Sequence, residues 1–169
     1  MPDRRDDTDT ESGVPVPRVL MSLHAQYYDM IMGGEKVYEY RKRYPTTGAS
    51  AWYVYLTAPT SILTAVIDLA APIPGSPTEI AQIAERARPG NGASVYDYLA
   101  PAGRGLALPI LRVREYPGLT ADELAAAAGT WHPPQGHTLI DRYPRLAKLC
   151  DQLIAAPIVR ERQVQPAQP

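Results

Sequence analysis

The segment that organises this sequence reads Gly33-Gly34-Glu35-Lys36-Val37-Tyr38-Glu39-Tyr40-Arg41-Lys42-Arg43-Tyr44-Pro45. It joins a glycine pair, which favours a turn, to a stretch with the aromatic content of a β-strand. Elsewhere the sequence does not gather so many ionisable groups so closely on predicted regular structure. We therefore expect the functional site to be built on this segment.

Residues 37–43 are expected to be extended, and side chains then alternate between the two faces of the strand. Tyr38 and Tyr40 share one face, which we expect to pack inward. The other face carries a carboxylate flanked by two guanidinium groups, from Glu39, Arg41 and Arg43. Lys36 lies at the start of the strand, beside the end of the preceding helix.

The flanking sequence predicts a strand and a helix before this segment and two strands after it. Residues 18–23 have a short strand pattern, and residues 24–32 place apolar side chains at the three- and four-residue spacing of a helix. Gly33 is expected to end that helix in a left-handed conformation. Residues 51–56 and 62–69 are rich in strand-forming side chains, and the second run is apolar enough for a buried central strand.

The remaining sequence predicts short helices and one more long strand. Helices are expected at residues 77–87, 120–128 and 143–154, the first two with favourable N-cap residues. A strand is expected at residues 105–116, where the alternation shifts beside Pro109 as it does at a β-bulge. The succession of elements predicts one α+β domain.

That domain is expected to span residues 18–156. Residues 1–17 are acidic and residues 157–169 are rich in proline and glutamine. Both segments have few large apolar side chains, so they are predicted to be disordered tails.

The composition narrows the class of protein. The chain has 169 residues, of which 45% are hydrophobic, and its net charge is -1, so binding of nucleic acid would require a local basic patch. A single cysteine, Cys150, excludes an internal disulfide and a cysteine-rich zinc site, and we expect its side chain to be buried. Without a membrane-spanning stretch or a signal peptide, we expect a cytoplasmic protein. We also expect no metal and no cofactor.

The pattern Gly34-Glu35-Lys36-x-x-Glu39-x-Arg41, which follows a strand and an amphipathic helix, resembles the ASCH domain, a branch of the PUA-like superfamily. The resemblance covers residues 18–70, and Pro133-Pro134-Gln135-Gly136 supports it farther along the chain. It implies a PUA-like β-barrel of about five or six strands surrounded by short helices.

The resemblance also implies two classes of function. Domains with the PUA-like fold bind RNA, and some hold a single modified base in a pocket. Some ASCH proteins are hydrolases that act on acylated cytidine, and others are ribonucleases. The amidohydrolases use a lysine, a threonine and a distant glutamate; Lys36 matches the lysine, but Glu39 stands at the position of the threonine.

The sequence therefore predicts a protein that binds RNA or a modified nucleoside in a cleft at this motif. The predicted nucleic-acid-binding residues are Lys36, Glu39, Arg41, Lys42 and Arg43. If the protein is an enzyme, Lys36 and Glu39 are the predicted catalytic pair. A third alternative is an interaction protein whose cleft has lost its activity.

Each candidate residue also has a structural alternative. Lys36 could be a solvated turn residue, Glu39 and Arg41 could form a plain ion pair, and the basic run could protect an edge strand from aggregation. Aromatic side chains on the predicted strands are expected to be core residues for the most part. The two histidines of the loop at 131–137 lack the spacing of a zinc motif. Arg112 and Arg114 either extend the basic groove or form a solvated strand face.

Overall fold

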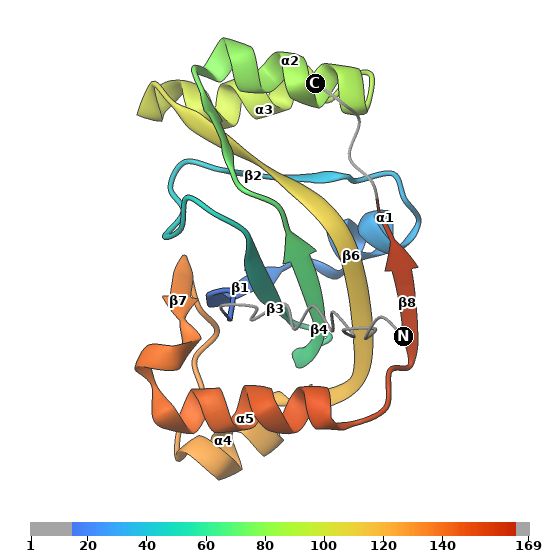
Figure 1. Cartoon of the computed structure of the whole chain (residues 1–169), viewed down its shortest axis with the longest axis vertical. Coiled ribbons are helices and arrows are strands. Elements are labelled where there is room, and N and C mark those ends of the chain that lie inside the picture. The colour runs from blue at the N-terminus through green and yellow to red at the C-terminus, as the bar shows by residue number, and fades with distance from the viewer. Residues whose placement is uncertain (1–14, 165–169) are drawn as a thin grey trace, which may run out of the picture.

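The structure, a computed structural model, describes residues 15–164 and shows a curled, mixed β-sheet with helices at both of its ends (Figure 1). The strands are β1 (Arg18–Leu23), β2 (Tyr38–Arg41), β3 (Ser50–Leu56), β4 (Ile62–Leu69), β5 (Ile73–Gly75), β6 (Gly105–Thr120), β7 (His137–Leu139) and β8 (Arg160–Gln163). The α-helices are α1 (Ala25–Met32), α2 (Pro77–Ala87), α3 (Gly92–Leu99), α4 (Ala121–Ala128) and α5 (Pro144–Ala155). Two short 3-10 helices lie at Ala100–Ala102 and Ile140–Arg142.

The sheet is arranged around the long strand β6, which pairs with β2, β4, β5 and β8. The main strand order is β2-β6-β4-β3-β1-β7, and only the β1–β3 pair among the paired strands of residues 15–164 is parallel. The strands curl into a half-barrel whose end strands are β2 and β7. This arrangement confirms the predicted α+β class with a barrel-like sheet, but residues 15–164 form eight strands where about five or six were predicted.

Three apolar clusters stabilise the fold, and together they bury both faces of β3 and β4. The first fills the barrel interior and includes Trp52, whose Nε1 donates a hydrogen bond to the carbonyl of Met21 at 3.1 Å. The second packs the outer face of the sheet against α4 and α5 and includes Cys150. The third packs α2 and α3 against β2 and β6. The predictions of buried central strands and of a buried cysteine are therefore confirmed.

Local signals predicted the helices well because their caps are encoded in neighbouring residues. Ser76 accepts a hydrogen bond from the backbone N–H of Glu79, whose carboxylate accepts one from the backbone of Ser76, which completes a capping box at the start of α2. Thr120 caps α4 with its side chain, whose Oγ1 accepts a hydrogen bond from the backbone N–H of Glu123 at 3.2 Å. The predicted irregularity of β6 is also present, since its pairing with β4 shifts between Asp68 and Leu69.

The turn after α1 differs from its prediction. Gly33 has a right-handed φ of -78°, and Gly34 is the residue with a positive φ, of 80°. The N–H of Gly33 continues the helical pattern by donating to the carbonyl of Asp29, which moves the left-handed position one residue along the chain.

The C-terminal segment also differs from its prediction. Residues 160–163, which lie in the predicted disordered tail, form β8 and pair antiparallel with β6 at residues 112–115. Val164 is 3% exposed and packs into the barrel interior. A polar strand of this kind shows no alternating apolar pattern, because its stability comes from the partner strand and from one buried anchor. The prediction of disorder for residues 1–14 and 165–169 concerns segments outside the described residues.

Among residues 15–164, no helix is both long enough and apolar enough to cross a membrane.

Candidate functional site

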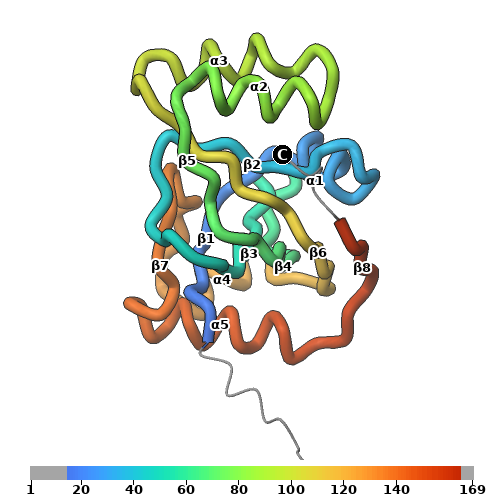
Figure 2. The backbone as a smooth tube through the Cα atoms, turned by 45° about the horizontal axis from the view of Figure 1, so that its top comes forward, coloured from blue at the N-terminus to red at the C-terminus, as the bar shows by residue number. Residues whose placement is uncertain are grey.

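Strand β2 lies between the helical pair α2–α3 and the strands of the barrel (Figure 2). Tyr38 belongs to the α2–α3 cluster, and Tyr40 packs against it. Glu39 is 8% exposed and is one of few buried charged residues in the described chain. The predicted inward tyrosine face is therefore present, but the charged face is covered as well, because β2 is enclosed from both sides.

Glu39 lies between two cations within this enclosure. Lys36 Nζ is 3.3 Å from Glu39 Oε2, and Arg41 Nε is 3.1 Å from Oε1. Less than a fifth of each of the three side chains is exposed. The buried Arg41 Nε lacks hydrogen-bond geometry to any partner among residues 15–164, so its contact with Glu39 is an ion pair. The structure thus brings Lys36, Glu39 and Arg41 together, whereas Arg43, which was predicted to flank Glu39, lies beyond the end of β2 and is exposed.

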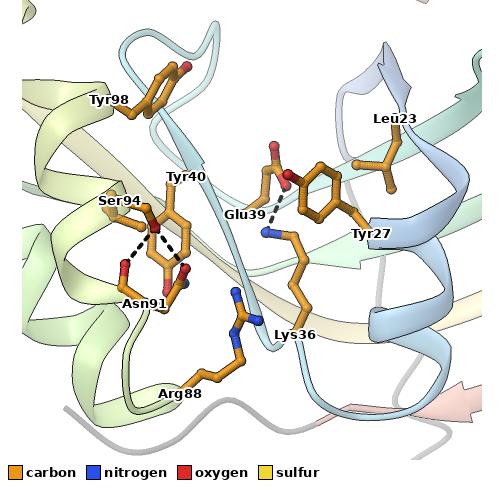
Figure 3. Close-up of a pocket in the computed structure, with 10 residues that line it drawn as sticks. Leu23, Tyr27, Lys36, Glu39, Tyr40, Arg88, Asn91, Ser94 and Tyr98 are labelled. Carbon is orange, nitrogen blue, oxygen red and sulfur yellow. Dashed lines mark hydrogen bonds and ion pairs between the residues drawn. The ribbon is translucent and has the colours of Figure 1, made fainter.

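Lys36, Glu39 and Tyr40 line a cavity of about 370 Å³ that we call the charged pocket. Its other lining residues come from β1, α1 and the α2–α3 pair: Leu23, Tyr27, Arg88, Asn91, Ser94, Val95 and Tyr98 (Figure 3). Lys36 Nζ lies 5.2 Å from the centroid of the Tyr40 ring, within the range of a cation–π contact. The pocket therefore joins a buried ion pair to aromatic surface.

Tyr40 adds a protonated hydroxyl to this pocket. Burial is the main cause that raises the pKa of Tyr40 well above its usual value. The hydroxyl therefore stays neutral over the physiological range and can donate a hydrogen bond.

The α2–α3 wall of the pocket is held by one carboxylate. Glu85 accepts hydrogen bonds from the backbone N–H groups of Gly90 and Gly92, both at 2.9 Å. A side chain at position 92 would lie 2.9 Å from that carboxylate and 3.0 Å from the carbonyl of Ala81, so glycine is needed for the close approach of the two helices. This turn places Asn91 and Ser94 at the pocket, where Ser94 Oγ donates to the Asn91 carbonyl at 3.0 Å (Figure 3).

The α1 wall positions Lys36 through its backbone. The N–H groups of Glu35 and Lys36 both donate to the carbonyl of Met30, at 2.9 and 3.1 Å. From the C-terminal strand, the Arg162 guanidinium donates to the carbonyl of Met32 at 3.2 Å. The end of α1 and the start of β2 are thus fixed together, and this orients the lysine side chain toward Glu39.

A second cavity, of about 610 Å³, adjoins the same strand, and we call it the basic hollow. It is lined by Met21, Arg41, Lys42, Arg43, Ala102, Arg104, Gly136 and His137. Lys42 and Arg43 were predicted from the sequence, whereas Arg104 was missed and His137 was noted only as a loop residue. Arg104 lies in the loop before β6 and His137 begins β7, and the only local signal for Arg104 is its position between two glycines.

The remaining candidates lie elsewhere. Arg112 and Arg114 both pair with Asp68, at 3.2 and 3.1 Å, so they form a structural cluster on the sheet and do not extend the basic hollow. His132 lines a separate cavity beneath α5 together with Trp131. Within residues 15–164, no group of three histidine, cysteine or acidic side chains is placed to hold a metal ion.

The loop that carries the Pro-Pro-Gln-Gly sequence is fastened to β1. Ser22 Oγ donates a hydrogen bond to the carbonyl of Pro134 at 2.8 Å. Gly136 and His137, which follow directly, line the basic hollow. This segment therefore connects the end strand β7 to the candidate site.

No family model matches the sequence, and no curated protein matches it. Solved structures of ASCH from Zymomonas mobilis resemble the fold. The ASCH crystal structure has 20% sequence identity and a TM-score of 0.67, with 88% of this chain and 99% of that chain covered. A serine-to-alanine mutant of the same protein has 20% identity and a TM-score of 0.68, with coverages of 81% and 99%. These matches show that the chain has the same fold as ASCH from Zymomonas mobilis.

Proposed function

We propose that this protein binds RNA and holds one base in the charged pocket. The observation that carries the proposal is the ion-pair series Lys36–Glu39–Arg41, in which Lys36 and Glu39 line a cavity that also has tyrosine walls. An ion pair that only stabilised an edge strand would not need an adjoining cavity. The sequence motif and the fold both favour the same site.

The chemistry of the pocket suits a nucleobase. A carboxylate has about four acceptor positions, so Glu39 can accept a hydrogen bond from an exocyclic amino group while it keeps both cations. Lys36 can donate to a carbonyl of the base. Tyr27 and Tyr98 offer aromatic rings at the pocket wall, and unpaired bases stack on such rings. A base in this pocket must be unpaired, which favours single-stranded RNA.

Binding of a labelled single-stranded RNA, followed by fluorescence anisotropy, tests the proposal. We expect Glu39→Gln and Lys36→Ala each to weaken binding by about 1–3 kcal/mol, because a buried polar contact is lost. Lys148→Ala is the matched control, since Lys148 is exposed on α5 and has no ion pair among residues 15–164. Wild-type affinity in both pocket variants would overturn the placement of the base.

The hydrolase remains the second candidate, and a specific observation favours it. Lys36 and Glu39 are 3.3 Å apart, their side chains are 15% and 11% exposed, and both line one pocket. In such a site Glu39 would accept a proton from the attacking water, and Lys36 would stabilise the negative charge that develops on the substrate oxygen. The acyl carbon–nitrogen bond would then break, and the amine would leave with a proton.

Turnover of acylated cytidine and of RNA by the purified protein separates the two candidates. A hydrolase must lose turnover in Lys36→Ala, whereas Lys148→Ala must keep it. A protein that binds RNA without turnover of either substrate is a binding module. Turnover that survives Lys36→Ala would place the activity in another site or in a contaminant.

A further inference from the structure

The basic hollow concentrates positive charge without an acidic side chain in its lining. Four basic residues and one histidine line it: Arg41, Lys42, Arg43, Arg104 and His137. Arg43, Arg104 and His137 are exposed, and none of them forms an ion pair with an acidic group among residues 15–164. The whole chain has a net charge of only -1, so this accumulation is local. Mutual repulsion of the cations would be relieved by an anionic ligand.

Two contacts link the lining of the basic hollow to the lining of the charged pocket. Arg41 lines the hollow, and its Nε contacts Glu39, which lines the charged pocket. Lys42 also lines the hollow, and its Nζ lies 4.8 Å from the centroid of the Tyr98 ring at the wall of the charged pocket. On the side of β1, Leu23 lines the charged pocket and Met21 lines the basic hollow. Both cavities are therefore lined by residues of β1 and of β2, and we call this row of cavities the seam.

A third cavity extends the seam past Arg104. It has a volume of about 430 Å³ and shares Lys42, Arg43 and Arg104 with the basic hollow. Its other lining residues are Tyr44, Pro74, Gly75, Gly105 and Leu106, none of which is acidic. The cationic surface is thus elongated, as a path for a chain of phosphates must be, and is larger than one small anion needs.

We propose that the basic hollow is a phosphate-binding track next to the base pocket, so that the ligand is a phosphorylated strand and not a free nucleoside. This inference rests on the proposed RNA binding and adds Arg104 and His137 to the site. A base in the charged pocket has its sugar at the rim near Tyr98. The adjacent phosphates then lie against Lys42, Arg43 and Arg104, whose side chains suit phosphate contacts.

The first test compares ligands on the full chain. Cytidine, cytidine monophosphate and a short single-stranded RNA are titrated and followed by thermal stabilisation. The inference predicts that cytidine gives the smallest shift in Tm at equal concentration and that each added phosphate increases it. Equal shifts for cytidine and its monophosphate would overturn the phosphate track and leave the base pocket intact.

The second test removes the charge of Arg104, which lines the basic hollow. Arg104→Ala is expected to weaken RNA binding by about 3- to 30-fold and to reduce the slope of log affinity against log salt by about one. Arg142→Ala is the matched control, because it removes the same charge from an exposed residue with no ion pair among residues 15–164. Its affinity and slope should change by much less.

The possible outcomes separate the two proposals. Equal losses in Arg104→Ala and Arg142→Ala would show that the general field of the protein attracts RNA, which overturns the track. Wild-type affinity in Arg104→Ala, with binding lost in Glu39→Gln, would also overturn the track while RNA binding itself stands. Failure of the unmodified protein to bind RNA would overturn the proposed function together with the track.

Discussion

Lys36 Nζ lies 3.3 Å from Glu39 Oε2, and each side chain is exposed over less than a sixth of its surface. A pair exposed to this small degree is screened less by solvent than a surface pair. Loss of either charge of this pair is therefore expected to affect the stability of the fold.

Glu39→Gln should destabilise the protein. It removes the anion between Lys36 and Arg41, so two partly buried cations remain without a counter-charge, and we expect the free energy of unfolding to fall by about 1–3 kcal/mol. Urea denaturation followed by tryptophan fluorescence measures this change. Glu35→Gln is the control, because Glu35 is exposed and has no ion pair among residues 15–164, and its effect should stay within about 0.5 kcal/mol. Equal losses would rule out a specific role for the contact.

Gly34→Ala should also destabilise the protein, through two causes. Gly34 has a φ of 80°, and an added Cβ would clash with the guanidinium group of Arg162. We expect the free energy of unfolding to fall by about 1–3 kcal/mol, because of backbone strain and displacement of the arginine. Gly48→Ala provides the comparison, since nothing lies within 4 Å of its Cβ position.

The two causes can be separated by a double variant. Gly34→Ala combined with Arg162→Ala removes the side-chain clash but keeps the backbone strain. The loss of unfolding free energy in the double variant should therefore be smaller than the sum of the losses in the two single variants. Strict additivity would show that the Arg162 side chain does not contribute to the requirement for glycine.

Truncation of the chain after residue 159 tests the C-terminal strand. The change removes β8, the buried side chain of Val164 and the ion pair of Arg160 with Glu115 at 2.9 Å. Burial of one valine contributes about 1.5–3 kcal/mol, so we expect the free energy of unfolding, measured by thermal or urea denaturation, to fall by at least about 2 kcal/mol. A chain that ends at Val164 keeps β8 and serves as the control. Equal stability of the two truncated chains would contradict a structural role for β8.

Cys150 should react slowly with a thiol reagent in the native protein. Burial is the main cause that raises its pKa from 9.0 to about 12, so the reactive thiolate is scarce near pH 8. A chromogenic disulfide reagent should modify Cys150 rapidly only after unfolding in urea. Rapid modification without denaturant would contradict its burial.

The same shift predicts a dependence of stability on pH. Because the folded thiol stays protonated while the unfolded thiol ionises, the unfolded state binds fewer protons above pH 9, and its ionisation favours unfolding. The contribution to stability is therefore complete below pH 9 and declines between pH 9 and about 12. Cys150→Ala should show a weaker decline over this range in urea unfolding, after allowance for its lower stability at pH 7. An identical decline would assign the effect to other groups.

Much of the fold could be predicted from local patterns. The capping box of Ser76 and Glu79 and the strand pattern of residues 62–69 depend on neighbouring side chains, so a single sequence contains the necessary information. The polar strand β8 could not be predicted in this way, because its order comes from pairing with β6, more than forty residues earlier. The turn at Gly34 was displaced by one residue for a related reason, since its conformation depends on how α1 ends.

By itself, the sequence determined the class of fold, the central strands and the pairing of Glu39 with Arg41, because residues two apart on one strand share a face. The contact of Lys36 with Glu39 depends on the turn before β2, from which the lysine side chain reaches back to the strand. Only the tertiary structure decided that the α2–α3 pair covers the tyrosine face and closes a pocket over these charges. It also brought Arg104, before β6, and His137, at the start of β7, to the same cavity from positions far apart in the chain. Such contacts depend on how the sheet curls, and local periodicity does not encode the curvature of a barrel.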